Sequence, residues 1–255
     1  MQESRDCVIQ RLHAELRGIV HTMPFDEACD KIHETLLSAG VTELEALELN
    51  RRLRTEFKLR PRRFRVFEFF LTRNCNLDCP YCFVHSREPE VMSRDTLDNA
   101  LRFILDRYDS KTKLSVVFMG GEPTMCFSHI KHAVNTLVNA IGRDPRKLRF
   151  DITTNGTLLT ESMMQFFSRN NVKVLISLDG DRDTHDLKRR TARGCGTFDM
   201  ITEKLPMIQR YQPYLGARMT IVPETVGQLL HDVGKVSDLG FRKIIVGPAT
   251  GVDWS

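Results

Sequence analysis

The sequence has neither a long hydrophobic run nor a cysteine framework. No apolar segment in its 255 residues approaches the ~20 residues that a membrane-spanning helix needs. The first six residues, MQESRD, lack the apolar core of a secretory signal peptide. The seven cysteines are odd in number and only three lie close together, which excludes a disulfide-stapled fold. From these absences we expect a cytoplasmic protein.

The chain also lacks a strong excess of charge of one sign. Its formal net charge of +4 neither indicates nor excludes a polyanionic partner for the whole surface. The hydrophobic fraction of 41% is ordinary for a soluble globule. A chain of this length suits one large α/β domain, or a barrel-like domain with a small appendage.

Positive charge is concentrated in one segment, from Arg51 to Arg65. Eight of its residues are Arg or Lys, against the single acid Glu56. Such a segment is either a solvated linker or exposed helix face, or a docking strip for an acidic peptide or a nucleic acid. Because no series of aromatic residues accompanies the charge, the pattern favours an acidic peptide over nucleic acid.

The first quarter of the sequence predicts helices only, over residues 5–20, 25–39 and 43–57. Gly40 ends the second helix, and the segment TELE, residues 42–45, is a capping box for the third. Beyond it, short β-rich runs alternate with amphipathic stretches. The predicted strands are 65–71, 114–119, 148–153, 172–178, 216–222 and 242–247, and the predicted helices are 93–108, 127–141, 160–169, 197–211 and 225–239.

Strict alternation of strands and helices requires parallel strands joined by right-handed crossovers. The sequence therefore predicts an α/β fold, a six-stranded parallel partial (β/α)6 barrel similar to a TIM barrel, with a small N-terminal helical appendage. We expect the appendage and its basic linker over residues 1–62 and the core over 63–255. Because the chain ends eight residues after the sixth strand, we expect a core truncated there, without a sixth helix.

The segment CNLDCPYC directly follows the first predicted strand and places Cys75, Cys79 and Cys82 at C-x3-C-x2-C spacing. Three thiolates on a cubane iron–sulfur cluster leave one iron open to a small molecule. The alternatives are a zinc knuckle, a disulfide pair with a spare thiol, or chance. A structural zinc site normally needs four ligands, and the nearest further candidate is His85.

Other motifs follow the remaining strands, where the loops of a parallel fold converge on one ligand. The segment GGEP (120–123) follows the second strand and TTNGT (153–157) the third. The fourth strand ends in SLDG (177–180), followed by His185, Asp186 and Arg189 and by GCGTFD (194–199), and the sixth ends in VGPA (246–249).

The cysteine spacing, with Tyr81 before the last cysteine, resembles the radical S-adenosylmethionine (SAM) superfamily. Together, GGEP, TNGT, SLDG and HDxxR…GxGTFD are similar to the branch that modifies peptides and proteins, which includes sulfatase-maturing enzymes and maturases of ribosomal peptides. This resemblance implies a [4Fe–4S] cluster on Cys75, Cys79 and Cys82. It also implies SAM contacts from Tyr81, Phe83, Gly120, Gly121, Glu122, Pro123, Thr154, Asn155, Ser177, Asp179, Arg189 and Gly247.

Within that set, the resemblance implies that Glu122 binds the ammonium group of SAM. It implies that Ser177 and Arg189 bind the ribose and the carboxylate of SAM, and that Tyr81 and Phe83 lie beside the adenine. The implied activity is cleavage of SAM to a 5′-deoxyadenosyl radical that abstracts hydrogen from a peptide or protein substrate. The implied partners are an acidic leader peptide on the basic segment and a reductant such as flavodoxin or ferredoxin. No catalytic acid or base is assigned.

Several alternatives stay open. Enzymes of this branch normally continue into a cysteine-rich domain with auxiliary clusters, whereas no cysteine follows Cys195 here, so the chain is a fragment or a variant. It can also be a truncated, non-catalytic remnant that binds a cluster or a peptide, or a radical SAM enzyme of small molecules. His185 is either a satisfied loop histidine or catalytic, Cys195 either reactive or incidental, and Asp186 and Asp199 can simply order loops.

Overall fold

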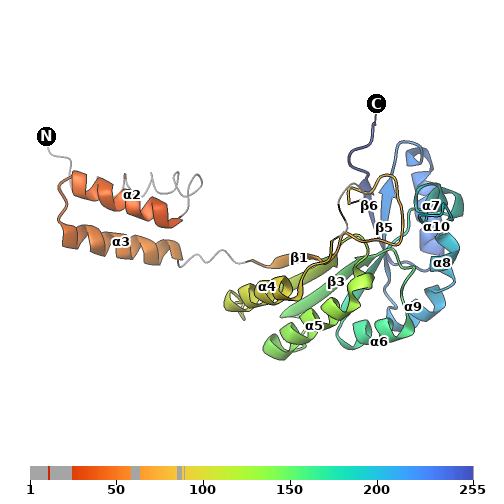
Figure 1. Ribbon diagram of the computed structural model, residues 1–255, viewed down its shortest axis with the longest axis horizontal. Coiled ribbons are helices and arrows are strands. Elements are labelled where there is room, and N and C mark those ends of the chain that lie inside the picture. Colours follow the sequence, from red (N-terminus) through yellow and green to blue (C-terminus); the bar gives the residue numbers. More distant parts are fainter. Residues whose placement is uncertain (1–10, 12–24, 59–63, 85–87, 89, 255) are drawn as a thin grey trace. The chain divides into compact units, whose positions relative to one another are not determined.

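The computed structural model describes residues 11, 25–58, 64–84, 88 and 90–254 (Figure 1). The chain divides into two compact units, Met1–Arg63 and Phe64–Ser255, and each is described by itself. In the described parts of the chain, no helix is long and apolar enough to cross a membrane.

The first unit contains a pair of packed helices, α2 (Phe25–Ser38) and α3 (Glu43–Lys58). Between them Gly40 takes a φ of +79°, a left-handed conformation that commonly ends helices. The backbone N–H of Thr42 donates to Oε2 of Glu45 over 3.4 Å, which is one half of the predicted capping box. Both helices match the prediction to within a residue. The helix predicted nearest the N-terminus lies almost entirely outside the described residues.

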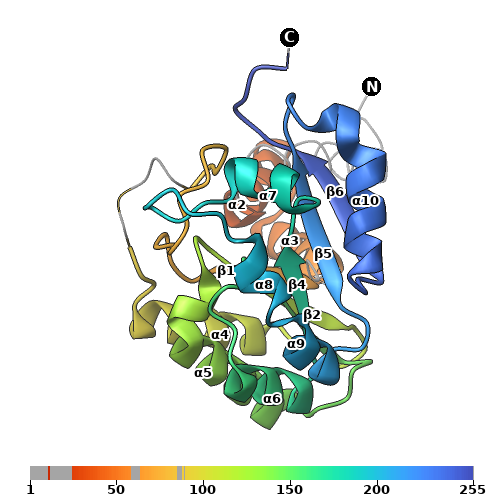
Figure 2. The same cartoon turned by 90° about the vertical axis from the view of Figure 1, so that its right-hand side faces the viewer.

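The second unit is built on a six-stranded sheet in which every neighbouring pair is parallel and the strand order follows the chain (Figure 2). The sheet is not closed, and β1 and β6 are its edges. This confirms the predicted partial barrel. The strands are β1 (Val66–Phe70), β2 (Leu114–Met119), β3 (Leu148–Thr154), β4 (Val172–Ser177), β5 (Gly216–Ile221) and β6 (Lys243–Pro248).

Helices connect the strands and cover one face of the sheet (Figures 1 and 2). The α-helices of this unit are α4 (Arg94–Asp106), α5 (Phe127–Ile141), α6 (Glu161–Arg169), α7 (Arg182–Lys188), α8 (Phe198–Thr202), α9 (Leu205–Tyr211) and α10 (Leu229–Asp238). Two short 3₁₀ helices, η1 (Pro123–Cys126) and η2 (Val226–Gln228), precede α5 and α10.

Alternation along the strands separates the core from a second, polar face. On β3, Leu148, Phe150 and Ile152 are buried in the hydrophobic core beneath the helices. The ring of Phe150 stacks on that of Phe118 in β2 with 6.1 Å between centroids. The half-buried residues between them, such as Asp151, point to the opposite face, which we call the inner face. This face is the concave surface available to ligands.

Candidate functional site

The carboxyl ends of the strands surround a cavity of about 320 Å³. All three clustered cysteines line it, together with the ends of five strands and the segment after β6. Of the predicted cofactor residues, eight lie in its wall: Tyr81, Phe83, Gly120, Gly121, Thr154, Asn155, Ser177 and Arg189. The fold therefore brings residues from most of the predicted motifs to one place.

The same three cysteines also line an adjoining cavity of about 550 Å³, so open space borders them on two sides. All three are free thiols. Burial raises the pKa of Cys79 to about 11, with smaller contributions from Cys75 and Cys82, whereas Arg189 acts in the opposite direction. All three thiols border the same two cavities, and bound iron would favour their deprotonated form.

The alternatives for the cysteine motif can be compared with this geometry. In the part of the chain that the structure describes, no three His, Cys, Asp or Glu side chains converge on a single ion. A zinc site requires such convergence, whereas a cubane cluster places each thiolate on a different iron. No disulfide joins Cys75, Cys79 or Cys82, and His85 lies outside the described residues. The donor set and the space beside it fit a cluster better than a zinc ion.

Two glycines allow β2 to end against the cysteine loop. The N–H of Gly121 donates to the carbonyl of Thr72 over 2.7 Å, and the N–H of Glu122 to that of Asn74 over 2.8 Å. A Cβ on Gly120 would lie 2.5 Å from the carbonyl oxygen of Thr72, and one on Gly121 2.3 Å from that of Asn74. The glycines are therefore required for close approach to protein backbone, in addition to lining the cavity.

Glu122 is fully buried and its carboxylate is held by protein donors. Oε1 accepts from the hydroxyls of Thr124 and Thr154 and from the N–H of Thr124, while Oε2 accepts from the N–H of Asn155 over 2.7 Å. Burial raises the pKa of this carboxyl, and these hydrogen bonds oppose the rise. Glu122 does not line the cavity, and Pro123 begins η1 as a buried residue. Contact of either residue with SAM stays a prediction.

The TNGT segment after β3 binds the cysteine loop. The side-chain amide of Asn155 donates to Oδ1 of Asn76 over 2.9 Å, and that of Asn76 donates to Oγ1 of Thr157 over 2.8 Å. The same Asn155 nitrogen lies 3.8 Å from the sulfur of Cys75. These contacts fix the loop relative to β3 and place one hydrogen-bond donor at a thiol that would hold the cluster.

Asp179, after β4, connects three elements at the cavity. Its carboxylate accepts a bidentate pair of hydrogen bonds from Nε and Nη2 of Arg189, at 2.7 and 3.0 Å. The hydroxyl of Tyr81 donates to Oδ2 over 2.5 Å, and the N–H of Thr220 donates to Oδ1 over 2.8 Å. Asp179 and Arg189 are both buried. Asp179 thus binds Arg189, predicted to hold the SAM carboxylate, and Tyr81, predicted to flank adenine.

The HDxxR…GxGTFD run is explained by contacts within the protein. Nδ1 of the buried His185 accepts from the N–H of Asp179, and its Nε2 lies 3.0 Å from Oγ1 of Thr197. Burial lowers the pKa of His185 to about 4. Oδ1 of Asp186 accepts from the N–H of Thr197 over 2.7 Å, and a Cβ on Gly196 would lie 2.2 Å from the Asp186 carboxylate. This agrees with the interpretation of His185 as a satisfied loop histidine.

The other motif residues lie further from the cavity. Asp199 forms an exposed ion pair with Arg182. Cys195 is an exposed free thiol. Gly247 lies in β6, and the three residues after it, Pro248 to Thr250, line the cavity in its place.

Sequence reasoning did not single out Arg218 and Thr220 of β5, although both line the cavity. Arg218 pairs in register with Ser177, so it lies on the same face of the sheet as a residue that was predicted. Strand alternation could have found both residues, because positions two apart share a face.

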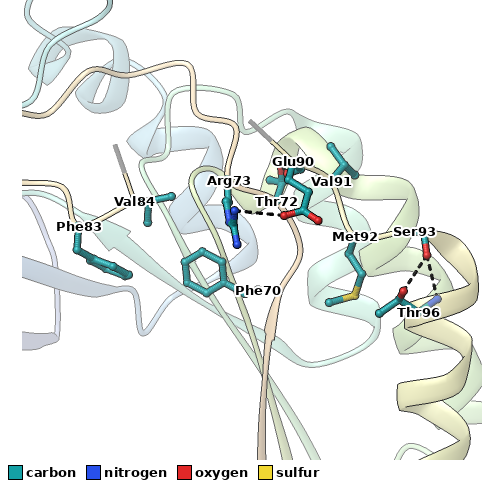
Figure 3. Close-up of a pocket in the computed structure, with 10 residues that line it drawn as sticks. All are labelled: Phe70, Thr72, Arg73, Phe83, Val84, Glu90, Val91, Met92, Ser93 and Thr96. Atoms are coloured by element: carbon teal, nitrogen blue, oxygen red, sulfur yellow. Dashed lines mark hydrogen bonds and ion pairs between the residues drawn. The ribbon is translucent and has the colours of Figure 1, made fainter. Parts of the chain in front are cut away.

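A further pocket of about 490 Å³ adjoins the cavity at the β1 edge (Figure 3). Phe83 and Val84 line both spaces. Figure 3 shows the rings of Phe70 and Phe83 near each other, and their centroids are 6.1 Å apart. Arg73 and Glu90 form an ion pair of 3.3 Å in the wall. The pocket is therefore mainly apolar with one charged pair.

Comparison with protein families matches residues 69–235 to the radical SAM superfamily. Among curated proteins, the cysteine-type anaerobic sulfatase-maturating enzyme of Clostridium perfringens (strain ATCC 13124) is 29% identical over 145 residues, covering 54% of this chain and 39% of that protein. The serine-type enzyme of Bacteroides thetaiotaomicron is 33% identical over 147 residues, covering 54% and 34%. The chain thus spans about two fifths of the length of these relatives or less.

Solved structures share the fold. Native anSMEcpe with bound AdoMet superposes with a TM-score of 0.63 at 23% identity, covering 72% of this chain and 51% of that one. Streptococcus suis SuiB bound to S-adenosylmethionine gives a TM-score of 0.56 at 18% identity, covering 89% and 54%.

Proposed function

Because this chain belongs to the radical SAM superfamily, we propose that it holds a [4Fe–4S] cluster on Cys75, Cys79 and Cys82 and cleaves SAM in the adjoining cavity. Members of this superfamily use both cofactors. The observation that carries the proposal is the 320 Å³ cavity lined by all three cysteines and by residues of five further motifs. When bound, the cluster supplies the electron that cleaves a carbon–sulfur bond of SAM.

The chain's own residues would bind and orient SAM and exclude water from the cavity. The exposed face of Phe83 and the ring of Tyr81 offer aromatic surface to the adenine. Ser177 offers a hydroxyl, and Arg218 offers a guanidinium on the same face of the sheet. The fork of Arg189 is bound to Asp179, so we propose that Arg189 contributes its positive charge and Arg218 the direct contact with the SAM carboxylate.

We further propose that the substrate is a peptide or protein side chain. Two observations support it. The relatives include sulfatase-maturating enzymes, and anSMEcpe and SuiB also superpose as complexes with a Cp18Cys peptide and with the precursor peptide SuiA. The apolar pocket of Figure 3 adjoins the cofactor cavity through Phe83 and Val84, and it could receive an apolar side chain beside the reacting residue.

The partners remain part of the proposal. An acidic leader would dock on the segment Arg51–Arg65, of which residues 59–63 lie outside the described structure. Within the described part, Arg51 and Arg52 both pair with Glu48 and lower its pKa to about 2, which compensates some of the charge. A small reductant, flavodoxin or ferredoxin, would supply the electron.

Anaerobic reconstitution tests the proposal. We expect about four irons per chain, and 5′-deoxyadenosine after addition of dithionite and SAM. A variant with Cys75, Cys79 and Cys82 replaced by Ala is the control. Deoxyadenosine no higher than in that control would contradict the enzymatic proposal. Iron incorporation without deoxyadenosine would favour the non-catalytic cluster-binding remnant. If a small metabolite stimulates SAM cleavage and no peptide does, the result would favour a small-molecule enzyme.

A further inference from the structure

A separate cavity of about 350 Å³ lies on the inner face, toward the amino-terminal ends of β3 to β6. It is at the opposite end of the strands from the three cysteines. The described residues that line it include the cations Arg149, Lys173, Arg242 and Lys243 and a single acid, Asp151. None of these residues belongs to the motifs that the proposed function uses.

Most of the positive charge in this cavity is uncompensated. Arg149 donates to both oxygens of Asp151 at 2.6 Å, so these two charges cancel. The other three cations, Lys173, Arg242 and Lys243, are exposed, and the described residues include no ion-pair partner for any of them. A concave surface with about three unpaired cations concentrates positive potential and attracts an anion.

Strand register explains why these groups share one hollow. Lys173 of β4 is directly beside Asp151 of β3, and Lys243 of β6 is directly beside Gly216 of β5. Gly216 places no side chain between Lys243 and Leu175 of β4. A Cβ there would lie 2.7 Å from Cδ1 of Leu175. The side chain of Leu175 therefore packs against Gly216 in the cavity wall, and the absence of a side chain on Gly216 is what permits this contact.

The cationic cavity borders the cofactor cavity, because Thr153 lines both. Along β4, Lys173 precedes the cofactor-cavity residue Ser177 by four positions. At roughly 3.3 Å per residue, this is a separation of ~13 Å. An extended peptide on the inner face would cover that distance with about four residues.

We propose that the cavity binds a carboxylate side chain of the peptide substrate, about four residues from the residue that reacts at the cofactor. This inference rests on the proposed function and names a feature of its substrate. A peptide fits better than a nucleic acid, because Tyr214 is the single aromatic residue among the described lining residues. Single-stranded nucleic acids are bound on several stacking rings.

Acetylation footprinting of the full chain tests the site without requiring turnover. The probe is a tetraglutamate peptide, and mass spectrometry follows the acetylation rate of each lysine. We expect tetraglutamate to slow acetylation of Lys173 and Lys243 several-fold, whereas Lys131 of α5 and Lys235 of α10, both exposed on helices, react as before. Tetraglutamine should protect neither pair. Equal protection of all four lysines would overturn the proposal, as would better protection by a tetrauridylate.

A binding measurement with a matched charge control completes the test. Fluorescence anisotropy with labelled tetraglutamate should show about tenfold weaker binding to a Lys173→Gln, Lys243→Gln variant, because two ion pairs are lost. The Lys131→Gln, Lys235→Gln variant removes the same net charge and should bind like wild type. Any binding on the segment Arg51–Arg65 is common to both variants. Equal weakening in both would contradict a specific site. If footprinting succeeds while SAM cleavage fails, the proposed function is wrong and the anion site stands.

Discussion

At the scale of single residues, one buried carboxylate organises much of the site. Asp179 receives hydrogen bonds from Arg189, Tyr81 and the backbone of Thr220. Its own backbone N–H donates to His185. The cysteine loop, β5 and the segment after β4 are therefore bound to one another through this residue. A buried ion pair of this kind is costly to break, because the remaining charge loses its partner in a place that water does not reach.

Replacement of Asp179 tests this role. Asp179→Asn keeps the shape and leaves the Arg189 guanidinium uncompensated, so we expect the free energy of unfolding to fall by about 3 kcal/mol. The control is Asp199→Asn, which breaks the exposed pair with Arg182 and should change the free energy of unfolding far less, because water already screens that pair. Urea unfolding followed by circular dichroism measures both. Similar losses in the two variants would show that burial of the Asp179 pair has no special weight.

His185 gives the unfolding free energy a defined pH dependence. Burial lowers its pKa from the ordinary 6.5 to about 4 in the folded chain. Above pH 6.5 the ring is neutral in both the folded and the unfolded state, and its contribution to the free energy of unfolding is fully present. Between pH 6.5 and 4 the unfolded chain binds the proton and the folded chain does not, so stability is lost as the pH falls. The 2.5-unit difference corresponds to a loss of roughly 3 kcal/mol.

The variant His185→Gln isolates this contribution. Urea unfolding between pH 7 and pH 4 should show a decline in wild type that is about 3 kcal/mol larger than in the variant. Glu122 acts in the opposite direction, because its pKa is raised and its neutral form is favoured by burial. That contribution is present in both proteins and cancels in the difference. Parallel pH profiles would mean that His185 is accessible to protons in the folded state.

At this scale the sequence predicted which residues gather, but not always what each one contacts. The thiols and most strand-end residues lie at one cavity, because parallel strands bring their carboxyl ends together. The direction of Glu122 was not readable, since a carboxylate at a strand end can bind either a ligand or neighbouring hydroxyls. Its carboxylate binds Thr124, Thr154 and Asn155. Likewise, no pattern in the sequence indicated that Asp179 would occupy the fork of Arg189.

At the scale of elements, strands were easier to predict than short helices. Each strand is a short apolar run, and all six were found to within one residue at each end. Helix α7 was missed, because seven mostly polar residues are too short for a helical period. The helix predicted over 197–211 is in fact α8 and α9. Pro206, in the first turn of α9, cannot donate a helical hydrogen bond and so separates them.

The contact between the end of β2 and the cysteine loop can be tested with two glycines. Gly121→Ala would place a Cβ 2.3 Å from the carbonyl oxygen of Asn74, so the loop must move, at a cost of about 1–3 kcal/mol. Gly234→Ala in α10 meets no atom within 4 Å and should stabilise the protein by about 0.5–1 kcal/mol. Urea unfolding should therefore give shifts of opposite sign. Stabilisation by Gly121→Ala would contradict the close approach.

At the scale of the whole molecule, the large hydrophobic cluster of the described residues belongs to one of the two units. The hydrophobic cluster runs from Phe69 to Phe241, so every one of its members lies in the unit Phe64–Ser255. The sheet and its helices pack around this cluster, and every described residue that lines the cofactor cavity belongs to the same unit. The prediction of separate regions over 1–62 and 63–255 remains to be tested by experiment, and the structure suggests how.

A protein containing residues 64–255 alone should fold cooperatively, because it keeps the whole described cluster and all six strands. Trp254, the chain's single tryptophan, donates its indole N–H to the carbonyl of Ala249 beside the cofactor cavity, so its fluorescence reports on the site. We expect one urea transition at the same midpoint by fluorescence and by circular dichroism, close to the transition of this unit in the full chain. The shortened protein should also take up about four irons, because all three cysteines lie within it. Loss of the tryptophan signal at a lower urea concentration than in the full chain would show that residues 1–63 stabilise the cavity. Two separated transitions in the shortened protein would show that residues 64–255 do not unfold as one cooperative unit.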